Sequence, residues 1–454
     1  MKSITLFLFT LLTANCFSQT FISKQKAADD IDFYNKTIEE VHVNPFLFIQ
    51  KKAYYQEVEK LKNSLGDSIS TNDFILLLYR LSALLKDGHN TPFIVQTVII
   101  DELRKEQFFP YNLISHNNKL FIPKSAAINS GLPVGGEIIS INSVYVNTLL
   151  PKMEKYIGGN KAYVKEMSGK FFSYFLFLSG IKAPFQIQYI DSSGKIKSKF
   201  IATGFKFKDA LAVTMPHIKN EYSFNILSDK LGYIDFMSMS GDFNRFDKFL
   251  DSCFTVIKKN NIKHVAIDIR KNSGGNSVLG DLLFSYITTK KYTMMGGRKW
   301  KVSAIYKNYL QQKGDTVNDY LKKANGTVWE LGNCEPQENR FKNNNQFSGK
   351  VYLLTGPFTF SSANMIADGA KQYKIAELIG EPTGENTNDF GEAYVFVLPN
   401  SKIKMQTTTS FDFGANCNKN TYQPVMPDKL IRNNLQDKIH EKDKVLEYIL
   451  SQIK

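Results

Sequence analysis

From residue 222 onward, short apolar runs alternate with stretches of helical spacing, and this alternation constrains the fold more than any other feature of the chain. The apolar runs lie at 231–236, 264–269, 351–355 and 376–380, and the helical patterns between them lie at 243–260, 277–288 and 361–373. Strands and helices that alternate in this way build a sheet with helices packed on its faces. We therefore expect a multidomain α/β protein whose core holds a mixed, partly parallel sheet.

The rest of the chain surrounds this core. Residues 25–90 are predicted to be helical, with a helix at 72–85 that Thr71 or Asn72 caps and that Gly88 follows. Short runs at 97–100, 120–122, 137–142 and 185–189 predict strands in a β-rich region. We expect a helical domain at 19–94, the β-rich domain at 95–205, the core at 206–432 with a polar insertion at 289–348, and a C-terminal helix at 433–454.

The charge balance argues against nucleic acid as a partner. The 454 residues are 43% hydrophobic and 22% charged, and 57 basic against 43 acidic residues give a formal net charge of +14. The basic residues are scattered, and their densest cluster is only Arg298-Lys299-Trp300-Lys301. A solvated basic surface accounts for this pattern better than a nucleic-acid groove does.

The start of the chain is typical of a signal peptide. Met1-Lys2 is followed by a short apolar run at 4–14, and Cys16-Phe17-Ser18 offers small residues for cleavage before Gln19. Cys16 is alternatively a lipoprotein cysteine, although Asn15 is a poor fit to the small residue expected before it. No later segment has 18 uninterrupted apolar residues. We expect an exported protein, periplasmic or extracellular, without a stable membrane span.

Cysteines and familiar motifs narrow the chemistry. Cys253, Cys334 and Cys417 are too few for a disulfide framework and allow at most one bridge. The sequence has no His-Glu-x-x-His, no Cys-x-x-Cys and no phosphate loop, so no metal or organic cofactor is expected. It has no Gly-x-Ser-x-Gly elbow either. A Ser-x-x-Lys match ending at Lys195 lies in a predicted hairpin turn and is not expected to be catalytic.

Three separated segments hold groups suited to acyl transfer. In Asp87-Gly88-His89 a histidine follows a helix, where it is either a general base or a structural capping residue. In 268–277 a strand enters a turn at Gly274-Gly275, whose backbone N–H groups can bind an oxyanion, although a simple strand-to-helix turn has the same pattern. Ser361 opens a helix after a buried strand, where it is either a nucleophile or an N-cap.

Together these segments resemble the C-terminal processing peptidase family, or tail-specific proteases, which includes tricorn protease and the interphotoreceptor retinoid-binding protein. The sequel Ile379-Gly380-Glu381-Pro382-Thr383-Gly384 strengthens the resemblance. It implies a ClpP/crotonase-like core with Ser361 as the nucleophile. It also implies an oxyanion hole made by the N–H of Ser362 and that of Gly274 or Gly275.

Upstream, residues 126–142 resemble the central stretch of a PDZ domain. The resemblance implies a PDZ-like domain that binds or gates peptide chains by strand addition. The alternative for 95–205 is a small β-barrel that acts only as a scaffold.

Two positions depart from the family pattern. Many members use a Ser-Lys dyad, but Asn386 occupies the lysine position, and an amide cannot accept the serine proton. The resemblance to the tricorn-like branch therefore assigns His89 as the base. Asn364 stands where the family often has Glu. For the carboxylate that orients His89 we name Glu392, with Glu385 in the same region, whereas Asp87 is close to His89 in sequence and His42 is expected to be structural.

These expectations describe an exported serine endopeptidase or C-terminal processing peptidase that acts on unfolded proteins or peptides without a cofactor. One alternative is a peptidase-like protein that no longer cleaves and instead binds a peptide or an apolar ligand. Another is an esterase that uses the same serine. The sequence does not indicate an oligomeric state.

Overall fold

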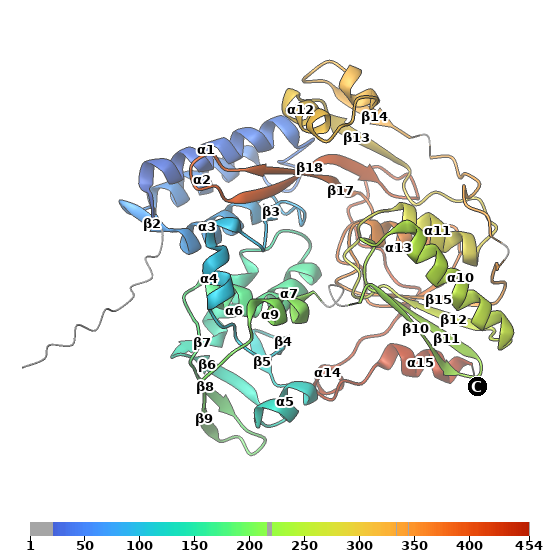
Figure 1. Ribbon diagram of the computed structural model, residues 1–454, viewed down its shortest axis with the longest axis horizontal. Coiled ribbons are helices and arrows are strands. Elements are labelled where there is room, and N and C mark those ends of the chain that lie inside the picture. The colour runs from blue at the N-terminus through green and yellow to red at the C-terminus, as the bar shows by residue number, and fades with distance from the viewer. Residues whose placement is uncertain (1–20, 216–219, 333, 344, 454) are drawn as a thin grey trace, which may run out of the picture.

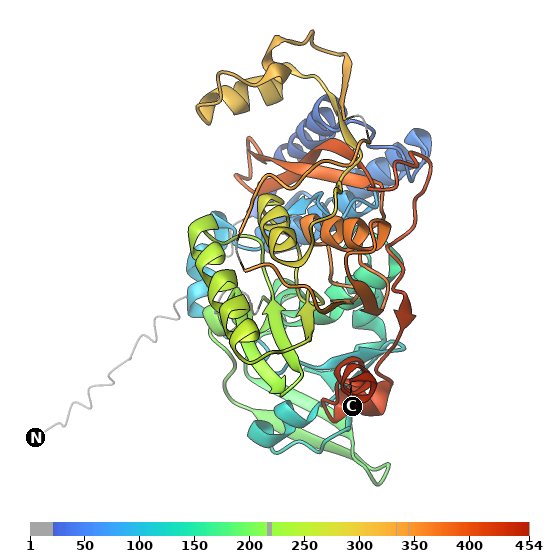
Figure 2. The same ribbon diagram turned by 90° about the vertical axis from the view of Figure 1, so that its right-hand side faces the viewer.

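The structure is a computed structural model that describes residues 21–215, 220–332, 334–343 and 345–453. The predicted signal peptide and the lipoprotein alternative at Cys16 lie outside the described residues. Figures 1 and 2 show the chain from two perpendicular directions. Among the helices that the structure describes, none is long and apolar enough to cross a membrane.

The core sheet has six strands in the order β10-β11-β12-β15-β16-β19 (Figure 1). Their bounds are Tyr222–Ser228, Leu231–Phe236, His264–Asp268, Lys350–Thr355, Glu377–Gly380 and Lys429–Leu430. Neighbours from β11 to β19 are parallel, and only β10 is antiparallel. The predicted partly parallel sheet is therefore confirmed.

Helices cover both faces of this sheet. Helices α10 (Phe243–Lys259), α11 (Val278–Ile287) and α13 (Ser362–Gln372) bury apolar side chains against one face, with Ile267 and Leu353 at its centre. Helix α15 (Lys444–Gln452) covers part of the other. The C-terminal helix predicted at 433–453 is in fact two, because α14 (Leu435–Ile439) ends before Asp443 caps α15.

A second sheet lies beside the core and has the order β14-β13-β18-β17, with β3 also paired to β18. The bounds are Val328–Leu331, Gly297–Lys301, Lys404–Phe413, Asp389–Val397 and, for β3, Thr91–Pro92. The insertion predicted at 289–348 thus supplies two strands, and it also holds α12 (Ala304–Gln312) and the 3₁₀ helix η3 (Asp319–Lys322).

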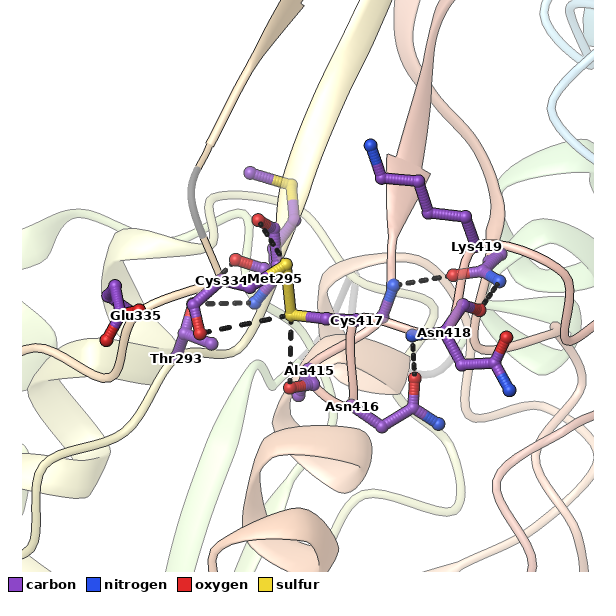
Figure 3. Close-up of a disulfide and its surroundings, with 12 residues drawn as sticks. Thr293, Met295, Cys334, Glu335, Ala415, Asn416, Cys417, Asn418 and Lys419 are labelled. Atoms are coloured by element: carbon purple, nitrogen blue, oxygen red, sulfur yellow. Dashed lines mark hydrogen bonds between the residues drawn. A yellow bond between two sulfur atoms is a disulfide. The ribbon is translucent and has the colours of Figure 1, made fainter.

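One disulfide ties the insertion to the chain after β18. It joins Cys334 to Cys417, and Figure 3 shows it beside Met295 and Ala415. Cys253 is a buried free thiol on α10. The expectation of at most one bridge among these three cysteines is met.

The N-terminal region is helical, as predicted. Its elements are β1 (Phe21–Ser23), α1 (Lys24–Val41), α2 (Lys51–Asn63), β2 (Ser68–Ser70) and α3 (Thr71–Ala83). The N-cap of α3 is Ser70, whose hydroxyl accepts from the Asp73 N–H, and not Thr71 or Asn72. Helix α1 packs along β18 and ends just before His42.

The third sheet has the order β4-β5-β6-β8-β9, with β7 paired to β6. The strands are Ile114–His116, Lys119–Phe121, Glu137–Ile141, Val144–Tyr145, Phe185–Ile190 and Ile196–Ile201, in the order β4 to β9. The helices around them are α4 (Ile100–Lys105), α5 (Lys124–Ser130), α6 (Val146–Glu154), α7 (Lys161–Lys170), α8 (Phe172–Leu178) and α9 (Phe207–Thr214).

The prediction of a strand at 97–100 is wrong. Residues Thr97–Ile99 form the 3₁₀ helix η1, which runs into α4. Acidic Asp101 and Glu102 in the first turn of α4 and basic residues in its last turn complement the helix dipole and outweigh the β-branched run before them. The β-rich prediction also missed the helical stretch from α6 to α8.

Candidate active site

Parallel strands bring two of the predicted segments and the segment of Glu385 to one edge of the core sheet. The chain after β12 holds Gly274 and Gly275, the chain after β15 holds Ser361, and the chain after β16 holds Glu385. These meet because the carboxyl ends of parallel neighbours lie at the same edge. His89 arrives from the N-terminal region, directly before β3. Ser361, His89, Gly275 and Glu385 line one cavity of about 350 Å³.

Ser361 is held in a strained turn that leaves its hydroxyl free. Its φ and ψ are 53° and −129°, a conformation that costs a non-glycine residue free energy. It precedes α13, but its side chain makes no capping hydrogen bond. The alternative that Ser361 serves as an N-cap is therefore wrong. Backbone strain of this kind collects at functional sites.

The glycine turn packs directly against this serine. A Cβ on Gly274, whose φ is +94°, would lie 2.8 Å from Ser361 Cβ and 2.8 Å from the Ser362 nitrogen. Only glycine permits this approach. The Gly274 N–H donates to Asn272 Oδ1 at 2.9 Å and is already used. Among the described residues, the N–H groups of Gly275 and Ser362 have no protein acceptor.

His89 presents its two ring nitrogens to different surroundings. Nδ1 lies 3.5 Å from Asp87 Oδ1 and 3.5 Å from Glu385 Oε1. Nε2 is buried and has no protein partner in the described chain. Two facing carboxylates favour the proton on Nδ1, so the lone pair of neutral His89 is on Nε2. The ring packs on Phe360, the residue before the serine, with centroids 4.7 Å apart.

The carboxylates also change the basicity of His89. Burial opposes the charged imidazolium, but the hydrogen bond toward Asp87 and the negative charge of Glu385 outweigh it and raise the pKa of His89 to about 9. A cationic His89 cannot accept the serine proton. The site therefore reaches its reactive protonation state as pH rises through this value.

Asp87 is fully enclosed and held from three sides. It accepts the backbone N–H of His89 at 2.8 Å and the Thr408 hydroxyl at 2.9 Å, and His42 Nε2 lies 3.4 Å away. The Asn44 N–H donates to His42 Nδ1, so the proton of neutral His42 is on the nitrogen that faces Asp87. Burial alone would raise the pKa of Asp87, but His42 and His89 hold it well below its usual range.

Glu385 connects His89 to Ser361. Its Oε2 accepts the Ser361 N–H at 2.5 Å. Burial raises the pKa of Glu385 well above its ordinary value, against the charge of His89. Burial and the negative charge of Asp87 raise the pKa of neighbouring Asp389 as well. Asn386, at the family's lysine position, donates to Asp389 and accepts from Asn364 through its carbonyl.

Glu392 lines the same cavity but is bound to the second sheet. Its carboxylate accepts from Arg298 Nη1 at 2.6 Å, Trp300 Nε1 at 2.8 Å and the Thr409 hydroxyl at 3.0 Å. Glu392 therefore contacts the insertion. The carboxylates that His89 faces are those of Asp87 and Glu385. From the sequence, Glu385 was only the alternative to Glu392. Its one marker was the neighbouring Asn386, which occupies the position of the family's lysine.

The other predicted features are structural. The Asp268-Arg270 pair at the end of β12 is completed by Asp443, and it attaches α15 to the core. The Ser-x-x-Lys match at 192–195 lies in the exposed turn between β8 and β9, where Ser193 within it donates to Asp191.

Comparison with known proteins places this site in a family. The model of "Peptidase family S41" matches residues 230–423. No curated protein sequence matches the chain. Mature CPAF complexed with lactacystin has a similar fold, with a TM-score of 0.66, 14% identity, and coverage of 95% of this chain and 98% of that one. Mature CPAF alone gives a TM-score of 0.64 at 15% identity, covering 95% of this chain and 97% of that one.

At such identities the likeness to CPAF shows the fold, and it extends well beyond the segment that the family model matches. That segment contains the glycine turn, Ser361 and Glu385. The expectation of a tail-specific peptidase relationship is confirmed over that segment: residues 230–423 match the model of peptidase family S41.

Proposed function

We propose that this protein is an exported serine peptidase that hydrolyses peptide bonds through an acyl-enzyme, with Ser361 as nucleophile and His89 as general base. The match of residues 230–423 to a peptidase family supports the reaction class. The observation that carries the residue assignment is that a free serine hydroxyl and a free imidazole nitrogen belong to residues lining the same cavity. Ser361 does not cap its helix, His89 Nε2 has no partner within the described residues, and both line one cavity.

The proposed reaction begins with neutral His89. Nε2 takes the Ser361 proton as Oγ attacks the peptide carbonyl carbon, and the carbonyl oxygen gains negative charge. The N–H groups of Gly275 and Ser362 stabilise this oxyanion. His89 then gives its proton to the leaving amine, and the acyl-enzyme forms. Water, deprotonated by the same nitrogen, attacks the ester and releases the second product.

The orienting carboxylates in this proposal are Asp87 and Glu385. Both face Nδ1 of His89 and stabilise the imidazolium that forms during each proton transfer. Glu392, which the sequence suggested for this role, is assigned instead to holding the insertion against the cavity. Its contacts with Arg298 and Trp300 support that assignment.

The domain organisation is also part of the proposal. We assign residues 1–18 to a signal peptide, 19–94 to the helical domain, 95–205 to a PDZ-like domain, 206–432 to a ClpP/crotonase-like peptidase core and 433–454 to the C-terminal helices. Helix α5, strand β6 and the turn between them, which cover most of 126–142, support a PDZ-like role in presenting peptide chains. Unfolded proteins or peptides are the substrates that the peptidase family implies.

The test compares the purified protein with Ser361→Ala and His89→Ala on an unfolded protein mixture, with fragments identified by mass spectrometry. Circular dichroism establishes that each variant is folded. Cleavage that both substitutions abolish supports the proposal, and Ser193→Ala, in an exposed turn, is the control that retains activity. If His89→Ala still cleaves, another base acts. If no folded form cleaves peptides or small esters, the protein is a peptidase-like binding protein.

A further inference from the structure

The cavity beside Ser361 continues along one face of helix α13. Asn364, Met365 and Asp368 follow Ser361 at intervals of three, four and seven residues, so they share a helix face, and all line the cavity. Seven residues of helix rise roughly 10 Å. A long side chain bound next to Ser361 can span that depth, whereas a short one cannot.

Two acceptors on this face lack donors. Asn364 is 4% exposed, and its Oδ1 has no partner in the described chain. Asp368 is 6% exposed, and its Oδ2 accepts the Ala415 N–H at 2.6 Å. No donor from the described residues reaches its other oxygen. A buried acceptor such as Asn364 Oδ1 is costly unless a ligand or water supplies a hydrogen, and the second oxygen of Asp368 is open to the same partner.

The walls between these acceptors are apolar and adaptable. Met365 lies between Asn364 and Asp368, and Met294 and Met295 also line the cavity. Methionine side chains fit unbranched aliphatic chains because they are flexible and polarisable. The cavity therefore combines an apolar passage with acceptors at its side and end.

The charge in the cavity is negative, in contrast to the +14 of the whole chain. The carboxylates that line it are those of Asp368, Glu385, Asp389, Glu392 and Asp412, and the cations are His89 and Arg298. Arg298 is fully engaged by Asp412 and Glu392. Burial raises the pKa of Asp368 to about 6, against the hydrogen bond from Ala415 and the charge of Lys371. A cation beside this carboxylate would offset the cost of burying its charge.

We infer that this part of the cavity is a substrate side-chain pocket for lysine or arginine. Asp368 binds the cationic end, and Asn364 Oδ1 accepts one of its hydrogens. The methionines contact the aliphatic stem. The inference rests on the proposed peptidase function, because it takes the residue bound there to be the one next to the scissile bond. It makes Asp368 a specificity-determining residue.

The experiment uses two peptides that differ in one side chain. The first carries one lysine in a sequence without other basic residues, and the second carries Nε-acetyl-lysine at the same position, which keeps the stem and removes the charge. Binding is measured by fluorescence anisotropy on Ser361→Ala, which cannot turn the peptides over. Cleavage rates are measured on the active protein.

Two variants make the comparison specific. Asp368→Asn keeps the shape of the side chain and an oxygen for the Ala415 N–H. Asp319→Asn removes the same charge from an exposed site and is the matched control. We expect the lysine peptide to bind roughly tenfold or more tightly than its acetylated form. Asp368→Asn should remove that preference without weakening the acetylated peptide, and Asp319→Asn should retain it.

The outcomes separate this inference from the proposed function. Cleavage without a preference for lysine overturns the pocket and leaves the peptidase standing. Lysine-selective binding that needs Asp368, without cleavage by any form, supports the pocket and overturns the peptidase. A preference that survives Asp368→Asn overturns the assignment of this carboxylate. If Asp368→Asn does not fold, the two peptides on Ser361→Ala still decide whether the cavity selects a cation.

Discussion

Glu385 accepts the backbone N–H of Ser361 through one carboxylate oxygen and faces Nδ1 of His89 with the other. The same side chain thus fixes the position of the nucleophile's backbone and the orientation of the base. Since Glu385 is 5% exposed, no competing solvent replaces either contact easily. Glu385 and His89 thus join two segments that are almost 300 residues apart in the chain.

Glu385→Gln should lower kcat by roughly 10² to 10⁴ while changing KM less. The amide can still accept the Ser361 N–H, but its NH₂ group does not stabilise a protonated imidazole. Steady-state kinetics on a peptide substrate measures the split. Glu381→Gln, on the same segment and paired with Arg432, is the matched control. An unaltered kcat in Glu385→Gln would leave Asp87 as the sole orienting carboxylate.

The pH dependence of kcat/KM should follow His89. Because the folded pKa is raised to about 9, activity should increase as pH rises through the alkaline range up to that value. The stability contribution runs the other way. It is fully present below the unfolded pKa of about 6.5 and is lost as pH rises through the folded pKa.

Asp87→Asn tests the cause of this shift. Removing the carboxylate that hydrogen-bonds His89 should move the acid limb of the kcat/KM profile to lower pH and reduce the plateau rate. NMR titration of the His89 ring in Ser361→Ala follows the same pKa without turnover. An unmoved pKa in Asp87→Asn would show that Glu385 alone sets the basicity of His89.

Gly274→Ala should destroy activity and destabilise the fold. The added methyl would lie 2.8 Å from Ser361 Cβ and the Ser362 nitrogen, at a φ of +94° that alanine disfavours. Gly194→Ala is the matched control, since its φ is +78° but nothing lies within 4 Å of the added carbon. Gly194→Ala should cost about 1 kcal/mol of unfolding free energy and keep activity. Equal effects of the two on activity would argue against close packing at the nucleophile.

Removing the Cys334–Cys417 bridge should lower the free energy of unfolding. The bridge closes a sequence separation of 83 residues, and chain entropy predicts a contribution of up to about 4.5 kcal/mol. Thermal unfolding with and without reductant measures it. The double variant Cys334→Ala/Cys417→Ala should unfold at the lower temperature under both conditions. A reductant effect that persists in this variant would have another origin.

Local patterns in the sequence predicted much of the core. The apolar runs that became β11, β12, β15 and β16 are buried on both faces of a sheet, so their pattern was strong. The region from α6 to α8 was missed because its helices are short, and Pro151 interrupts the pattern of α6. The run at 97–100 was misassigned because β-branched residues there favour strand locally, whereas the helix depends on charges further along.

The sequence by itself determined the candidate residues for chemistry: a serine after a buried strand, a histidine after a helix, and a glycine turn between strand and helix. Only the tertiary structure decided their partners. Parallel pairing brought the ends of β12, β15 and β16 together, and pairing of β3 with β18 brought His89 to them. Glu385 and not Glu392 meets His89. The position of a side chain in the sequence does not reveal which distant segment packs against it. Those contacts depend on sheet register and burial, which are properties of the whole fold.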